Sequence, residues 1–489
     1  LPMQSMPVEM GVGSQALFNN LLNGTVPTFG FSTSFEQCGS NSDGFSCGFP
    51  AASSGESAGS AYRGGGDGGA GPSIVLHQAV GAFDITGLRG GTAQEVSDWL
   101  NANGYQSAVT APSILQDYVS KGYVFLAIKL TGGTGIDEIH PLVVRYAGNT
   151  PCVPLKLTSV AAVPDMGVRT FFLGSERVVP SNYKHVTLNQ ARIDWAAYGN
   201  NYNQVVSRAV DSPVSDGRGF VTEYAGPSNV VSAQGVYDPA WNPSKFQNIA
   251  PELVVKELGI QKLVQCSYYT CQYLHPLVKP LLEEFLPRPA GLTEDEFYSN
   301  LASYKGQIDM AVWNAASFAA RLDELIVQPG LHATLLLEQN PYLTRLFTTI
   351  SPEEMTIDPE FRRRPGLPDV PRLTQATQRV LCNGGSIFTL PNAQVVALDN
   401  QTASWPKFSD DELWAETIED VPATGDPIVL VDNTKKIQDQ VDASNARNNW
   451  PPETAGCECG LPSTRSQSLV GVLGLAGAAM LWSRRRARP

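Results

Sequence analysis

The fold is decided by the stretch from Ile74 to Gly226, which opens with IVLHQAV (residues 74–80) and, after Gly81, AFDITGL (82–88). Short apolar runs hinged at a glycine are typical of β-strands. Further strand-like runs follow at residues 123–130, 141–146 and 168–173. We therefore expect a β-sheet in this part of the chain.

Two helices are expected between the second and third of these strands. Thr92 and Glu95 have the spacing of a capping box, in which each side chain binds a free backbone N–H group of the first helical turn. A second helix is expected over residues 112–121 because it begins with proline and ends before glycine. The order strand, helix, helix, strands favours an α+β fold with a mixed or antiparallel sheet and flanking helices.

The chain is long enough for two or three domains. A helical period and a second capping box, at Thr293 and Glu296, predict a mainly helical region after the core. Residues 373–396 are expected to form strands. We divide the chain into an N-terminal segment with a Gly/Ser-rich loop (1–71), an α+β core domain (72–243), a helix-rich region with short C-terminal strands (244–400), an acidic and polar linker (401–456) and a hydrophobic tail (457–489).

The acidic composition excludes one class of partner. The formal net charge is −13, and without the five arginines of the tail 29 basic residues stand against 47 acidic ones. Nucleic acid is not expected as a partner, because its binding is driven by basic surface.

The scattered cysteines favour disulfides in an exported protein over a zinc ribbon. Six of the eight lie in the body of the chain, and six cysteines allow fifteen pairings, so their spacing leaves the connectivity open. We expect the pairs Cys38–Cys47, Cys266–Cys271 and Cys152–Cys382.

The tail carries the sharpest signal in the sequence. Cys457 and Cys459 precede a polar spacer, then fourteen uncharged residues (469–482), then a basic cluster that contains Arg484, Arg485 and Arg486. Fourteen helical residues span about 21 Å, which is less than the roughly 30 Å of a hydrocarbon core. The arginines are expected to stay on the cytoplasmic side and the body of the chain outside. A buried core helix is the alternative interpretation.

This tail resembles the myxobacterial sorting signal called MYXO-CTERM. The resemblance implies recognition by a myxosortase-type membrane protease, removal of the helix and anchoring at the cell surface or outer membrane through Cys457 or Cys459, after a transient stay in the inner membrane. The run LPST (461–464) is also similar to the sortase signal Leu-Pro-x-Thr-Gly, but Arg465 replaces the glycine.

Parts of the body resemble an exported bacterial family, common in myxobacteria, that is defined only as a domain of unknown function. The resemblance spans residues 12–361. It rests on DWLNANGY (98–105), KGYVF (121–125), PCVPLKLT (151–158), VPSN (179–182) and VTEYAG (221–226). Members of that family begin with a Cys-Gly-Gly-Phe-Phe-Cys-like segment that is not found here, so we expect an incomplete N-terminus. The resemblance implies no catalytic residues.

Two local patterns suggest chemistry. Ser57 lies in a Gly-x-Ser-x-Gly motif, which would make it the nucleophile of a hydrolase, but the flanking low-complexity sequence predicts neither the strand nor the helix that this turn needs. Cys266, Cys271 and His275 could contribute to a zinc site. Export instead favours a Cys266–Cys271 disulfide with an exposed His275. His185 and Asp194 bracket a strand-like segment, and we interpret them as ordinary structural residues.

These observations favour an exported, cell-surface protein without enzymatic activity, structural or ligand-binding, fixed to the cell envelope by its processed tail. We assign no catalytic, cofactor-binding or metal residues and no cofactor. The alternatives are a secreted-type hydrolase that uses Ser57 and a metal-binding module at Cys266, Cys271 and His275.

Overall fold

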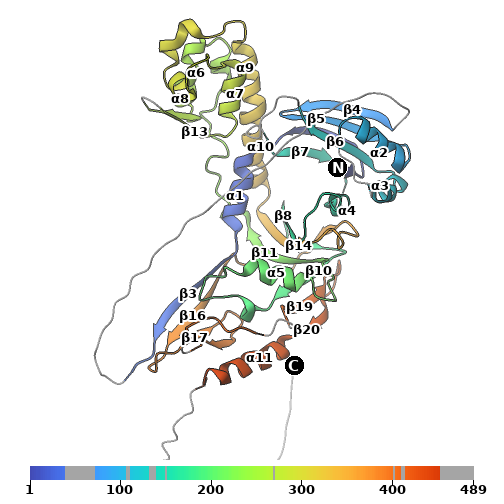
Figure 1. Ribbon diagram of the computed structural model, residues 1–489, viewed down its shortest axis with the longest axis vertical. Helices are drawn as coiled ribbons and strands as arrows, with labels where there is room; N and C mark the ends of the chain where they lie inside the picture. The colour runs from blue at the N-terminus through green and yellow to red at the C-terminus, as the bar shows by residue number, and fades with distance from the viewer. Residues whose placement is uncertain are drawn as a thin grey trace, which may run out of the picture.

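The structure is a computed structural model of the chain. It describes residues 1–38, 72–105, 111–131, 139–148, 151–267, 270–399, 402–408 and 413–451. Helices and strands are mixed throughout these residues, as the predicted α+β class requires. Figure 1 shows a helical cluster at one end, a small sheet beside it, a larger sheet in the middle and a further sheet at the other end.

The first three predicted strands form an antiparallel four-stranded sheet together with a short N-terminal strand that was not predicted. Its order is β1 (Pro2–Met3), β6 (Val124–Leu130), β5 (Phe83–Arg89) and β4 (Ser73–Val80). The predicted helices are present as α2 (Ala93–Ala102) and α3 (Ala111–Ser120), and the capping box at Thr92 and Glu95 is formed. Leu88, Val96 and Phe125 belong to the buried cluster between these helices and the sheet. The sequence therefore predicted this part correctly.

A six-stranded mixed sheet occupies the middle of the molecule (Figure 1). Its order is β20 (Ile428–Asp432), β19 (Ala415–Asp420), β10 (Lys184–Leu188), β11 (Gly219–Pro227), β14 (Tyr342–Ile350) and β8 (Met166–Gly174). Within this order β10 and β11 run parallel, and the other neighbours are antiparallel. Helix α5 (Tyr202–Val210) buries Val205, Val206 and Ala209 in the same core as Trp195.

A second four-stranded sheet joins the two ends of the chain. Its order is β18 (Val395–Ala397), β17 (Ser386–Thr389), β16 (Leu373–Val380) and β3 (Thr28–Phe35). Strands β3 and β16 are parallel and paired over their whole length. Helix α11 (Thr434–Arg447) contributes the buried Ile437 and Val441 to the adjoining core. Three small strand pairs complete the sheets of the described residues: β2 (Pro7–Val12) with β7 (Leu142–Tyr146), β9 (Val178–Pro180) with β15 (Phe361–Arg363), and β12 (Val264–Cys266) with β13 (Cys271–Tyr273).

The helical cluster shares its core with the first sheet. It contains α6 (Val254–Ile260), α7 (Val278–Phe285), α8 (Glu294–Ser299) and α9 (Ala315–Leu322), and a π-helical turn (Asp323–Val327) continues α9 into α10 (Gln328–Gln339). Helix α10 lies beside α1 (Gln15–Thr25) (Figure 1). Ile85 and Leu126 of the sheet belong to the same buried cluster as Phe246 and Leu282. No helix in the described part of the chain is both long and apolar enough to cross a bilayer.

Two sequence expectations are corrected. The region after the core is not mainly helical, because its helices end at Gln339 and β14, β15, β16, β17 and β18 follow. Strand β14 was missed because it is buried between two other strands and carries polar residues in the core, so it lacks the alternation of a half-buried strand. The segment 401–456, expected as a linker, contains β19, β20 and α11. Its acids are compatible with a sheet because Lys184 pairs with Asp420 at 2.7 Å.

Candidate functional site

Polar side chains from four segments meet beside the parallel strands β10 and β11. His185 lies on β10 and Thr222 on β11, while Arg177 directly precedes β9. Glu419 lies on β19, opposite His185 in the antiparallel register. The sheet thus brings together residues that are far apart in the sequence.

Thr222, His185 and Glu419 form a chain of polar contacts. His185 Nε2 lies 3.1 Å from Thr222 Oγ1 and 3.4 Å from Arg177 Nη2. Because a guanidinium only donates, this network assigns the ring proton to Nδ1. Nδ1 faces Glu419 Oε2 at 3.6 Å, and hydrogen bonding to His185 is the main cause that lowers the pKa of Glu419. The hydroxyl of Thr222, the imidazole of His185 and the carboxylate of Glu419 therefore follow one another in this order.

These residues adjoin a cavity of about 210 Å³ that Arg177, His185 and Thr222 line together with apolar side chains. Phe29 forms part of its apolar wall, and its ring lies 5.4 Å from that of Trp195 and 5.3 Å from that of Tyr202. A wall of buried aromatic rings with a few convergent polar groups is the usual composition of a small-molecule site.

Two buried polar atoms of this lining have no partner among the residues that the structure describes. They are Arg177 Nε and Gln190 Oε1, whereas Nδ1 of His185 faces Glu419. Leaving a buried donor or acceptor unsatisfied costs about 1–3 kcal/mol. Two such atoms on one cavity indicate a place where another molecule can supply the missing partners.

Glu223 also lines the cavity, but a buried arginine of the protein, Arg345, neutralises its charge. It forms an ion pair with Arg345 in which the two side chains are 1% and 3% exposed. Arg345 further donates to Thr25 Oγ1 and to the carbonyl oxygen of Leu22, each at 3.1 Å. Burial raises the pKa of Glu223, and Arg345 opposes that rise. This pair therefore satisfies its own charges.

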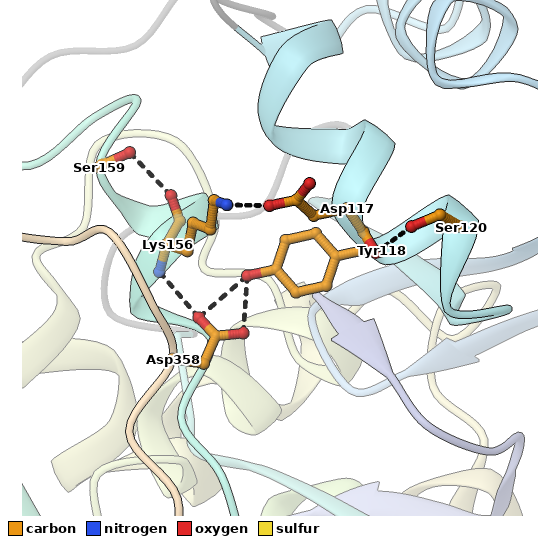
Figure 2. A network of polar contacts seen from close by, with 6 residues as sticks. All are labelled: Asp117, Tyr118, Ser120, Lys156, Ser159 and Asp358. Atoms are coloured by element: carbon orange, nitrogen blue, oxygen red, sulfur yellow. Dashed lines mark hydrogen bonds and ion pairs between the residues drawn. The ribbon is translucent and has the colours of Figure 1, made fainter. Parts of the chain in front are cut away.

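A second polar cluster lies between α3, the short helix α4 (Leu155–Thr158) and the segment before β15 (Figure 2). The Tyr118 hydroxyl lies 2.7 and 2.9 Å from the two carboxylate oxygens of Asp358, and the backbone N–H of Lys156 donates to Asp358 at 2.8 Å. The Lys156 ammonium pairs with Asp117. Burial raises the pKa of Asp358. Each of these groups has a partner, so we interpret the cluster as a bracket between three segments.

The structure contradicts two of the three expected disulfides. Cys38 is bonded to Cys382, so the predicted pairs Cys38–Cys47 and Cys152–Cys382 are wrong. The cause is the parallel pairing of β3 and β16, which brings Cys38 and Cys382 together just beyond the strand ends. Cys152 is a half-buried free thiol whose pKa is raised by burial, and Cys47 lies outside the described residues.

The predicted pair Cys266–Cys271 is present and closes the β12–β13 hairpin. The metal-binding alternative is therefore wrong, because both thiolates are consumed. His275 is 5% exposed rather than on the surface, and its ring packs against Trp241 at 6.0 Å. No group of three potential ligand residues that could hold a metal occurs among the described residues.

The other sequence-based candidates lie outside the described residues. They are Ser57 and the tail residues Cys457, Cys459, Arg484, Arg485 and Arg486.

Sequence reasoning missed the site beside β10 and β11. It treated His185 and Asp194 as structural residues; Asp194 does have such a role, since its carboxylate accepts from the backbone N–H of Ala197 at 3.0 Å. No local motif connects His185 with Thr222 or Glu419, which are 37 and 234 residues further along the chain. The burial of Arg177 is visible only in the structure, so the sequence offered no signal for this site.

A family model described as an uncharacterized protein conserved in bacteria, DUF2330, matches residues 1–362. The chain belongs to the DUF2330 family. This result confirms the expected membership of a bacterial family of unknown function. No curated protein and no solved structure matches the chain. The DUF2330 match includes Arg177, His185 and Thr222, whereas Glu419 lies beyond it.

Proposed function

We propose that this DUF2330 protein is an exported cell-surface protein that binds a ligand and has no enzymatic activity. The observation that carries the proposal is the disulfide between Cys38 and Cys382, which are 344 residues apart. Disulfides form and persist in oxidising compartments and are rare in the cytosol. The disulfide between Cys266 and Cys271 supports the same compartment.

The tail supplies the proposed means of attachment. Its resemblance to MYXO-CTERM signals implies that a myxosortase-type protease removes residues 469–489 and that Cys457 or Cys459 carries the anchor. The fourteen uncharged residues and the following arginines hold the unprocessed chain in the inner membrane until cleavage.

The site beside β10 and β11 favours binding over catalysis. Thr222 is 8% exposed, and its hydroxyl group is engaged on both sides, by Arg177 at 3.1 Å and by His185 at 3.1 Å. A contact with a histidine alone would activate a hydroxyl as a nucleophile, but here Arg177 also donates to the Thr222 oxygen, which lowers its nucleophilicity. A fluorophosphonate probe tests the hydrolase alternative at Ser57 and also the reactivity of Thr222, and we expect it to label neither residue.

The test of export is the state of the protein in its native cells. Cell fractionation, a thiol count on denatured, unreduced protein and the intact mass are measured on the same sample. We expect the protein in the envelope fraction. Cys38 and Cys382 should not react with the thiol reagent, because they form a disulfide. The intact mass should correspond to a chain that ends near Cys457 or Cys459. A cytoplasmic protein with both cysteines free would contradict the proposal.

A matched pair of variants tests the anchor. Cys457→Ser combined with Cys459→Ser should release the body from the envelope, while Cys152→Ser should leave it attached. Retention of residues 469–489 in the mature protein would refute processing and leave export to be judged by the disulfides alone.

A further inference from the structure

Arg177 is a buried cation without a direct carboxylate partner. It is 6% exposed, and no ion pair within 4.0 Å joins it to an acidic side chain in the described part of the chain. Arg345, which is also buried, differs from Arg177 in that it forms an ion pair with Glu223. Buried charges are normally paired, since water no longer screens them. Burial lowers the pKa of Arg177, and the charges of Asp369 and Glu419 oppose this change without a direct ion pair.

The guanidinium of Arg177 is oriented by the protein, which leaves one N–H group for another partner. Nη1 donates to the carbonyl oxygen of Pro368 at 2.7 Å, and Nη2 donates to Thr222 at 3.1 Å. Nε has no partner among the described residues. The adjacent His185 directs its Nδ1 towards Glu419 Oε2 at 3.6 Å, so Nε of Arg177 is the donor left for a ligand. A fixed cation with an open N–H donor is complementary to a carboxylate.

The remaining lining defines the rest of the ligand. Phe29, Trp195 and Tyr202 supply aromatic surface, and Gln190 Oε1 is an acceptor without a partner in the described residues. The cavity, about 210 Å³, is smaller than the roughly 300–1,000 Å³ of sites for drug-sized ligands. Glu223 and Glu419 lie close by, so a dianion would be repelled more strongly than a monoanion.

We propose that this cavity binds a small organic monocarboxylate, with the carboxylate on Arg177 and a compact apolar or aromatic body against Trp195 and Phe29. The proposal rests on the ligand-binding function above and names the class of ligand. It is independent of where the protein is located, because it concerns the folded body alone.

The experiment is calorimetric titration of the purified full-length protein with defined probes. The carboxylates are propionate, benzoate and phenylacetate, and each is paired with its neutral amide. We expect at least one carboxylate to bind at least tenfold more tightly than its amide, because only the carboxylate brings a negative charge into direct contact with Arg177. Inorganic phosphate is the anion control and should bind at least tenfold more weakly than the best carboxylate.

Two variants and one control locate the binding. Arg177→Gln should lower the affinity for the best carboxylate at least tenfold and make it equal to the affinity for the amide. Arg363→Gln, at an exposed arginine of β15, should change neither affinity. Thr374→Phe narrows the same cavity without touching Arg177, so it should weaken carboxylate and amide alike. This second variant keeps the test decisive if Arg177→Gln fails to fold.

Three results would overturn the proposal: equal affinity for carboxylates and amides, binding of phosphate as tight as that of the best carboxylate, or no binding of any probe at millimolar concentration. Equal losses in Arg177→Gln and Arg363→Gln would place the carboxylate elsewhere and also refute it. Failure here with a protein that is still found in the envelope would spare the proposed export.

Discussion

Cys38 and Cys382 are covalently linked across 344 residues, each just beyond the end of one of two parallel, fully paired strands. The disulfide ties the N-terminal strand β3 to β16, which lies beyond the part of the chain that the family match covers. Strands β3 and β16 are therefore held together both by backbone hydrogen bonds and by a covalent bond.

This disulfide should stabilise the fold more than the other one does. In the chain-entropy model, closing a loop of this length contributes about 6 kcal/mol, compared with about 2 kcal/mol for the short Cys266–Cys271 loop. We predict that Cys38→Ser with Cys382→Ser lowers the free energy of unfolding, measured in urea, more than Cys266→Ser with Cys271→Ser. Cys152→Ser is the control and should have little effect. Equal losses for the two pairs would argue against the loop-entropy explanation.

The buried pair of Glu223 and Arg345 should show strong coupling. Arg345→Met leaves the Glu223 carboxylate buried without its partner, so we predict a loss of about 3–5 kcal/mol in the free energy of unfolding. Adding Glu223→Gln should restore part of this loss, because the remaining uncompensated charge is removed. A double-mutant cycle measures the coupling, and strictly additive losses would contradict it.

The Tyr118 hydroxyl should stabilise the bracket shown in Figure 2. Tyr118→Phe removes the donor that faces both oxygens of Asp358, and we predict a loss of about 1–3 kcal/mol in the free energy of unfolding. Tyr198→Phe, at a tyrosine that is 64% exposed, is the matched control and should stay within about 0.5 kcal/mol. A loss no larger than that of the control would mean that the network contributes nothing measurable.

His275 should make the stability depend on pH. Burial lowers the pKa of His275 to about 4 from the ordinary value of 6.5, so between these values the unfolded chain binds a proton that the folded chain does not. The free energy of unfolding should therefore fall as pH falls from about 6.5 to about 4, by about 3 kcal/mol.

The variant His275→Asn tests this dependence. Asparagine can still accept the hydrogen bond that Leu277 N–H donates to His275 Nδ1 at 3.2 Å, and it does not titrate. Its unfolding midpoint in urea should vary less with pH than that of the wild type, whereas His332→Gln at an exposed histidine should retain the wild-type profile. Identical profiles for wild type and His275→Asn would show that other groups cause the dependence.

The parts of the fold that the sequence predicted correctly are local. The capping boxes at Thr92 and Thr293 form as expected because their partners lie three residues away, within the same helical turn. The Cys266–Cys271 disulfide is equally local. The wrong pairings at Cys38 and Cys152 depend on a parallel strand pair between distant segments, which no short-range pattern encodes.

The candidate site failed to be predicted for the same reason. Arg177, His185 and Thr222 come from separate short elements, and Glu419 from a segment whose acids suggested solvent exposure. Their juxtaposition follows from strand order and register, and no residue spacing reveals these before the sheet is known.

The family match ends within β15, yet two sheets need strands from beyond it. A chain cut after residue 362 would lose β16, which is the neighbour of β3, and β19, which lies against β10. The exposed rows of N–H and C=O groups would then be free to pair with other molecules, so such a fragment should aggregate. The boundary of the recognised family is therefore not the boundary of a folding unit, and any recombinant fragment of this protein should extend at least through α11.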